Sequence, residues 1–177
     1  MRIIWLIFIG LALAIAGLLP RRRPAGRPTV AARPASAPAV ASPGRADSVV
    51  AFAVRQLGAP YLYAGTSPAT GFDCSGFVQY VYGHFGVAVP HSTTLLIDAG
   101  RPVPRADARP GDLVVFTGTA RESATPGHAG IIIAADPAGP IRFVHASSAR
   151  RESGVKVSQV EGTGYEQRFM QVRRVLD

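Results

Sequence analysis

The spacing of the apolar residues changes near residue 100, and this change constrains the fold more than any other feature of the sequence. Before it, helical spacing predicts three helices, at 47–57, 73–86 and 92–99. After it, short β-branched runs bounded by Gly and Pro predict five strands. These runs are Leu113–Phe116, Gly130–Ala134, Ile141–Ala146, Val155–Val160 and Phe169–Leu176. Their connections are too short for helical crossovers, so we expect an α+β domain with helices packed on a mostly antiparallel sheet of five to six strands.

Residues suited to capping mark the ends of the first two predicted helices. Asp47 can cap the first helix, and Gly58 ends it. Asp73 precedes the second helix in the same way, and Gly86 ends that helix. Cys74 is therefore expected in the first turn of the second helix.

The first 19 residues are distinct from the rest of the chain. Ile3–Leu19 is an unbroken apolar run behind Met1 and Arg2. It has the charged start and the small-x-small site, Ala14–Ala16, of a secretory signal peptide. It would also span roughly 26 Å as a helix, at the short end for a membrane anchor. Both interpretations stay open, and both place the rest of the protein in the cell envelope, as a periplasmic or extracellular domain.

Residues 20–45 are rich in Pro, Ala and Arg and are expected to form a disordered linker. They also explain the charge of the chain. The formal net charge is +8, but seven of the 19 Lys and Arg residues and none of the Asp and Glu residues precede residue 46. The predicted domain, 46–177, therefore carries a net charge of only +1. This balance argues against nucleic-acid binding, which needs a basic face on the folded part, and we expect a monomer.

Cys74 is the only cysteine in the chain. It excludes an intramolecular disulfide and leaves too few ligands for a thiolate zinc site. Two interpretations remain, a packed small side chain or a reactive thiol. Unpaired N–H groups and the helix dipole favour an anion at a helix start, and the pKa of a thiol, ordinarily about 8.5, falls at such positions or beside a histidine. The position of Cys74 therefore favours a reactive thiol with a lowered pKa.

A cysteine nucleophile needs a base, and the base needs an orienting partner, both distant in sequence. His128 lies just before the predicted strand Gly130–Ala134, and His145 lies near the end of the next one, so the two histidines could face each other. His84 lies late in the second predicted helix and is expected to be solvated. His91 follows a proline in a loop and could lie near the site or be merely exposed; of the two, we expect it to be exposed.

Five motifs together resemble those of the NlpC-type cysteine endopeptidases of bacterial cell walls, whose domain has a papain-like α+β fold. They are Pro60–Gly65, Phe72–Val78, Pro110–Phe116, Gly127–Ile131 and Phe143–Ser148. The resemblance extends from about residue 47 to residue 176. Its final segments, 154–158 and 173–176, look like those of the single-domain envelope endopeptidases of Gram-negative bacteria.

The resemblance implies a role for each of three site residues. Cys74 would be the nucleophile, His128 the general base, and His145 the polar residue that orients the ring of His128. The oxyanion would be bound by the backbone N–H of Cys74 and the hydroxyl of Tyr61.

Two further positions, and two differences from the family pattern, concern substrate binding. In some relatives the positions of Asp73 and Ser75 hold the amine of the substrate, although Asp73 can equally be a helix cap. Ala64 replaces the first of two glycines in the family pattern, which narrows a loop. His91 stands where the family pattern has an arginine, so the substrate contacts at this position are not predicted from the resemblance.

The implied function is hydrolysis of peptidoglycan stem peptides through an acyl-enzyme, at the D-glutamyl-diaminopimelate bond or at a D,D cross-link. The alternatives are a non-catalytic wall-binding or adaptor module, and an amidase or acyltransferase of the same superfamily. No motif indicates a metal, nucleotide or organic cofactor. The expected partners are stem peptides, together with membrane contact through residues 3–19.

Overall fold

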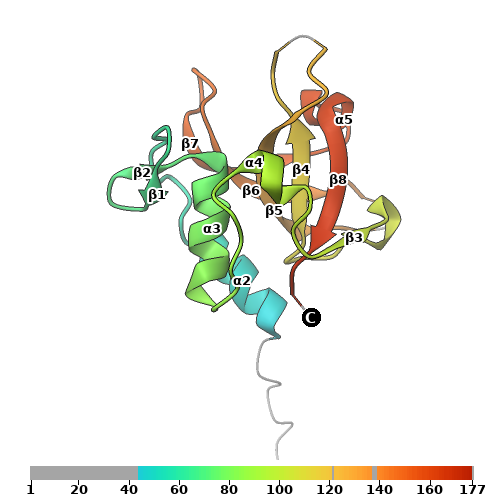
Figure 1. The fold of residues 1–177 in the computed structure, drawn as a ribbon, viewed down its shortest axis with the longest axis horizontal. Coiled ribbons are helices and arrows are strands. Elements are labelled where there is room, and N and C mark those ends of the chain that lie inside the picture. Colours follow the sequence, from blue (N-terminus) through green and yellow to red (C-terminus); the bar gives the residue numbers. More distant parts are fainter. Residues whose placement is uncertain (1–43, 121, 137–138, 177) are drawn as a thin grey trace, which may run out of the picture. The chain divides into compact units, whose positions relative to one another are not determined.

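A computed structural model describes residues 44–120, 122–136 and 139–176 (Figure 1). The predicted leader, 1–19, and almost all of the predicted linker lie outside the described residues. Within the described ranges, none of the helices has the length and apolar character needed to cross a bilayer.

The predicted α+β class is confirmed: among the described residues, three helices precede a six-stranded antiparallel sheet, and a fourth helix precedes its last strand (Figure 1). The strand order is β3-β8-β4-β5-β6-β7, and a separate short hairpin, β1-β2, precedes α3. The elements are α2 (Arg45–Val54), β1 (Thr66–Ser67), β2 (Gly71–Phe72), α3 (Cys74–His84), α4 (Thr93–Leu96), β3 (Arg101–Val103), the 3₁₀ turn η1 (Arg105–Asp107), β4 (Leu113–Thr117), β5 (Pro126–Ala134), β6 (Arg142–Ser147), β7 (Gly154–Gln159), α5 (Gly164–Arg168) and β8 (Phe169–Arg174).

Both faces of the sheet are covered, which accounts for the continuous apolar runs of its strands. On one face, buried residues of β4 and β5 such as Val115 and Ile131 pack against Phe77 and Val81 of α3. On the other face, Phe116 and Phe143 pack with the ring of Tyr165. Burial of each large apolar side chain contributes about 1.5–3 kcal/mol to folding, so the sheet is a firm base for residues on β5 and β6.

Three local expectations are corrected. The N-cap of α2 is Gly44, and Asp47 lies in the first turn, where its carboxylate accepts the backbone N–H of Gly44 at 3.2 Å. The helix predicted at 92–99 covers only Thr93–Leu96, because the residues after it continue as turns. The sequence also gave no indication of β3, which contains a proline and lies at the edge of the sheet.

One of the five motifs has a structural role. Asp112, in Pro110–Phe116, is buried, and its two carboxylate oxygens accept hydrogen bonds from the guanidinium group of Arg174, each at 2.7 Å. The same carboxylate accepts the backbone N–H of Arg109 at 2.8 Å. A bidentate, buried pair of this kind fixes geometry as well as adding energy. It joins the entry of β4 to the end of β8.

Candidate active site

Cys74 is the first residue of α3, and Asp73 is its N-cap, as predicted. The Asp73 carboxylate accepts the backbone N–H of Gly76 at 2.7 Å and the hydroxyl of Ser75 at 3.1 Å. A side chain at Gly76 would collide with the backbone carbonyl of Gly65. The small residue therefore lets the loop before β1 approach the first turn of the helix, and this contact helps to fix the position of Cys74.

His91 does not lie free in solvent, so the expectation that it is exposed was wrong. Its Nε2 lies 3.0 Å from each carboxylate oxygen of Asp73, and its side chain retains 27% of its exposure. Asp73 is itself almost buried. The carboxylate that caps α3 is therefore shared between the helix start and His91, which brings this residue into the site.

His128 on β5 and His145 on β6 face each other, with His128 Nε2 2.8 Å from His145 Nδ1. The other ring nitrogen of His145, Nε2, lies 2.9 Å from the hydroxyl oxygen of Ser158 on β7. Three neighbouring strands thus form one chain of hydrogen bonds. Sequence reasoning missed Ser158, whose only signal was its position on the strand after the one that holds His145.

Burial keeps both site histidines neutral. Burial, with the positive charges of Arg168 and Lys156, lowers the pKa of His128 from 6.5 to about 4. Burial, followed by the proximity of His128 and of the same two cations, lowers the pKa of His145 to about 2. Both rings are therefore uncharged at neutral pH, the form in which an imidazole can accept a proton.

The thiol of Cys74 has a raised pKa, contrary to the lowered value expected from its position. Burial raises the pKa most, and the neighbouring Asp73 carboxylate raises it further. The backbone N–H groups of Ala129, Ser75 and Cys74 itself act in the opposite direction but do not outweigh these two effects. Asp73, which caps α3, thus disfavours the Cys74 thiolate, whereas the start of the helix favours it. The resting site holds a neutral thiol beside a neutral imidazole.

Two cavities meet at Cys74, and Tyr61 and Gly127 also line both. The first, here called the Asp73 cavity, has a volume of about 450 Å³ and contains Asp73, Ser75 and His91. The second, here called the Arg168 cavity, has a volume of about 410 Å³ and contains His128, Arg150 and Arg168. The structure thus brings Cys74, His128 and Tyr61 to one opening, with Asp73 and Ser75 on its other side. Such a groove can hold an extended peptide across the thiol.

Ala64, which also lines the Asp73 cavity, has a φ of 58°. This is the left-handed region, which glycine enters freely and which costs an alanine roughly 1–2 kcal/mol. The departure from the family pattern therefore strains the backbone beside the cavity, whereas the sequence predicted only a narrower loop.

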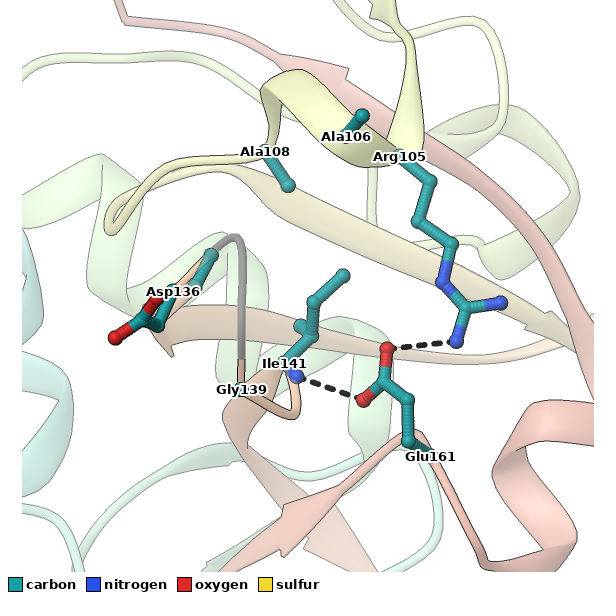
Figure 2. Close-up of a pocket in the computed structure, with 8 residues that line it drawn as sticks. Arg105, Ala106, Ala108, Asp136, Gly139, Ile141 and Glu161 are labelled. Atoms are coloured by element: carbon teal, nitrogen blue, oxygen red, sulfur yellow. Dashed lines mark hydrogen bonds and ion pairs between the residues drawn. The ribbon is translucent and has the colours of Figure 1, made fainter.

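The remaining histidine and a further cavity lie apart from this arrangement. His84 is exposed, as predicted, and its ring stacks on Phe52 at 3.9 Å between centroids. A cavity of about 340 Å³ is lined by residues from η1 and from the ends of β5 and β7, none of which lines the two cavities at Cys74 (Figure 2). There the Glu161 carboxylate accepts hydrogen bonds from Arg105 and from the Ile141 N–H, each at 2.7 Å. These bonds join η1 to the start of β6, a structural role.

The geometry around Cys74 agrees with a comparison with known families. The model of the NlpC/P60 family matches residues 58–174. The chain belongs to the NlpC/P60 family. The match includes all six residues singled out for the site, and it confirms the resemblance predicted from the five motifs.

Similar proteins include NlpC/P60 relatives of two kinds. The murein DD-endopeptidase MepS/murein LD-carboxypeptidase of Escherichia coli K12 is 40% identical over 113 residues, covering 63% of this chain and 54% of its own. The gamma-DL-glutamyl hydrolase of Bacillus subtilis is 35% identical over 136 residues, covering 76% of this chain and 30% of its own. The chain thus spans about half or less of each of these relatives.

The fold is similar to that of a solved NlpC/P60 family protein from Bacillus cereus. That structure has a TM-score of 0.64 and 29% identity, over 77% of this chain and 41% of the other. It supports the antiparallel sheet and the preceding helices as the common part of the NlpC/P60 domain.

Proposed function

We propose that this NlpC/P60 protein is a cysteine-type peptidoglycan endopeptidase that hydrolyses stem-peptide amide bonds. The observation that carries the proposal is that Cys74, at the start of α3, lines the same cavity as His128, whose Nε2 lies 2.8 Å from Nδ1 of His145. The name of the E. coli relative, a murein DD-endopeptidase, supports the substrate class and a D,D cross-link, and the name of the B. subtilis relative, a gamma-DL-glutamyl hydrolase, supports cleavage at a glutamyl bond.

The hydrogen bonds of the histidine pair support one nitrogen of His128 as the base. His128 uses Nε2 towards His145, so Nδ1 is the nitrogen left to accept the thiol proton. A neutral imidazole carries one N–H, so His128 must donate from Nε2 to His145 Nδ1. His145 then carries its own N–H on Nε2 and donates it to Ser158. In this arrangement the Ser158 hydroxyl accepts the last N–H of the chain of hydrogen bonds.

In the proposed reaction, His128 Nδ1 takes the proton of Cys74 as the sulfur attacks the peptide carbonyl. The developing oxyanion is stabilised by the backbone N–H of Cys74 and the hydroxyl of Tyr61. His128 then gives the proton to the leaving amine, and the C–N bond breaks to leave a thioester on Cys74. Water, deprotonated by His128, hydrolyses the thioester and restores the thiol.

The tautomer assignment predicts the effect of changing Ser158. Ser158→Ala leaves the buried His145 N–H without its acceptor, so kcat is expected to fall about tenfold while KM stays the same, because an unpaired buried donor costs about 1–3 kcal/mol. Ser158→Thr retains the hydroxyl and should recover most of the rate. Steady-state kinetics on a stem-peptide substrate measure both. A loss of kcat in both variants would show that the position matters for packing instead of hydrogen bonding.

Digestion of purified muropeptides, followed by mass analysis of the products, tests the proposed function. We expect new fragments whose masses identify either cleavage between D-glutamate and diaminopimelate or opening of a D,D cross-link. Hydrolysed products also distinguish the endopeptidase from an acyltransferase, whose products would retain the acyl group on an acceptor. A product profile identical to that of untreated muropeptides would contradict the proposal and favour a wall-binding module.

We also propose that the chain acts in the cell envelope, with residues 46–177 as the peptidase domain. Residues 1–19 would provide export or anchoring, and residues 20–45 a tether long enough to let the domain reach the wall. The composition of these segments and the murein-directed name of the E. coli relative support this placement.

A further inference from the structure

The two cavities at Cys74 differ in charge. The Asp73 cavity contains a carboxylate, shared with His91. The Arg168 cavity contains two guanidinium groups, and among the described residues that line it there is neither Asp nor Glu. A substrate lying across Cys74 therefore meets negative charge on one side and positive charge on the other.

The place of His128 shows which part of the substrate enters the Arg168 cavity. His128 lines this cavity and does not line the Asp73 cavity. In the proposed reaction His128 protonates the leaving amine, so the fragment that departs with that amine lies on the same side as His128. The acyl part then extends along the Asp73 cavity.

The two arginines are available to a ligand in different ways. Arg168 is held in place: its Nη1 donates to the Thr117 carbonyl at 3.1 Å, and its guanidinium group lies 4.6 Å from the centre of the Tyr165 ring. Arg168 lines the same cavity as His128, and its charge lowers the pKa of His128. Arg150 is exposed and makes no hydrogen bond or ion pair within the part of the chain that the structure describes. The nearby acid in sequence, Glu152, is bound by Lys156 at 2.9 Å.

We propose that Arg150 and Arg168 form a carboxylate-binding subsite for the leaving fragment, an inference that rests on the proposed function and deepens it. Guanidinium groups bind carboxylates through paired, charge-assisted hydrogen bonds, and Arg168 supplies a fixed charge while Arg150 closes from the exposed rim. The preferred leaving residue carries a free carboxylate close to the amine that His128 protonates. Diaminopimelate has this chemistry at a D,D cross-link, where the leaving amine and the free carboxylate share one carbon. At the D-glutamyl bond the carboxyl beside the leaving amine is free only when no residue follows diaminopimelate in the stem.

Two substrates that differ only in one group test the subsite. Each is a stem peptide with diaminopimelate as the leaving residue, one with its free carboxylate and one with the carboxamide. The wild-type kcat/KM is expected to be about 10- to 100-fold higher on the carboxylate, the equivalent of one or two charge-assisted hydrogen bonds. Arg150→Gln and Arg168→Gln should each reduce this ratio, and the double variant should bring it close to one. Arg168→Lys keeps the charge and should retain part of the preference.

Arg151→Gln is the matched control, because Arg151 is exposed next to Arg150 but does not line the cavity. For Arg151→Gln, the ratio of kcat/KM on the carboxylate peptide to kcat/KM on the carboxamide peptide should equal that of the wild type. A wild-type ratio near one, or variants that slow both substrates equally and leave the ratio unchanged, would overturn the subsite.

Binding of the same two peptides to Cys74→Ala, measured by calorimetry, separates this inference from the proposed function. Tighter binding of the carboxylate peptide, lost in the Arg150 and Arg168 variants, supports the subsite even if the wild type hydrolyses neither peptide. Equal binding of both peptides contradicts the subsite even if hydrolysis is confirmed.

Discussion

Hydrolysis of stem peptides by the Cys74→Ala variant is expected to be at least about 10⁴-fold slower than by the wild type. Removal of a covalent nucleophile leaves only binding and oxyanion stabilisation, and losses of this size are typical of such sites. The Cys74→Ser variant should be nearly as inactive as Cys74→Ala, because His128, whose pKa is lowered to about 4, is too weak a base to activate a hydroxyl. Initial rates on one purified muropeptide, followed by chromatography, measure the loss.

The control for Cys74→Ala is its stability. Cys74 is only half-buried, and the capping bonds of Asp73 do not involve its sulfur. The free energy of unfolding should therefore change by no more than about 1 kcal/mol. A folded Cys74→Ala protein that retains the wild-type rate would show that hydrolysis does not pass through this thiol.

The activity is expected to persist at lower pH than an ordinary histidine base would allow. Only neutral His128 can accept the thiol proton, and burial lowers its pKa to about 4, so kcat/KM should fall only as the pH falls through about 4 instead of through 6.5. His128→Gln removes the base and should lower the rate about 10³-fold at every pH. A pH profile of kcat/KM measures both effects.

Lys156→Gln provides a second check on this pH dependence. The charge of Lys156 helps to lower the pKa of His128, so its removal should raise that pKa and move the acid limb to higher pH. An acid limb that stays at 6.5 in the wild type would contradict the assignment of buried, neutral His128 as the base.

The stability of the fold must be measured in the same experiment, because the free energy of unfolding, like the activity, is expected to decrease as the pH falls. The folded-state pKa values of His128 and His145 lie below the unfolded value of about 6.5, so the unfolded chain binds more protons as the pH falls. The free energy of unfolding should therefore decrease from about pH 6.5 downwards. Circular dichroism at each pH separates loss of the base from loss of the fold.

The sequence was sufficient to predict the fold class and the elements that position the site. Periodicity located the helix that begins at Cys74 and the strand that holds His145, since burial on one or both faces leaves a clear pattern in the residues. The predicted strand Gly130–Ala134 was too short, because β5 begins at Pro126 and includes His128. The shortest elements, such as β3, were not predicted, because two or three residues have no readable period. Their pairing with distant strands stabilises them instead.

The electrostatic environment of Cys74 could not be predicted from the sequence. The proximity of His91 to Asp73 depends on a loop that returns to the start of α3, and it brought a residue into the site that was expected to be exposed. The raised pKa of Cys74 has a similar origin, because burial and a capping carboxylate act through distances that sequence spacing does not give. Ser158 likewise enters the site only through the pairing of β6 with β7.

The mass of the intact protein, measured after rapid acid quenching of its reaction with a stem peptide, tests the central claim most directly. The account predicts a transient species heavier than the free protein by the mass of the acyl fragment, with the added mass mapped to Cys74 and absent from Cys74→Ala. Hydrolysis by the wild type with no such adduct at any quench time, or with the added mass on another residue, would contradict a thioester on Cys74.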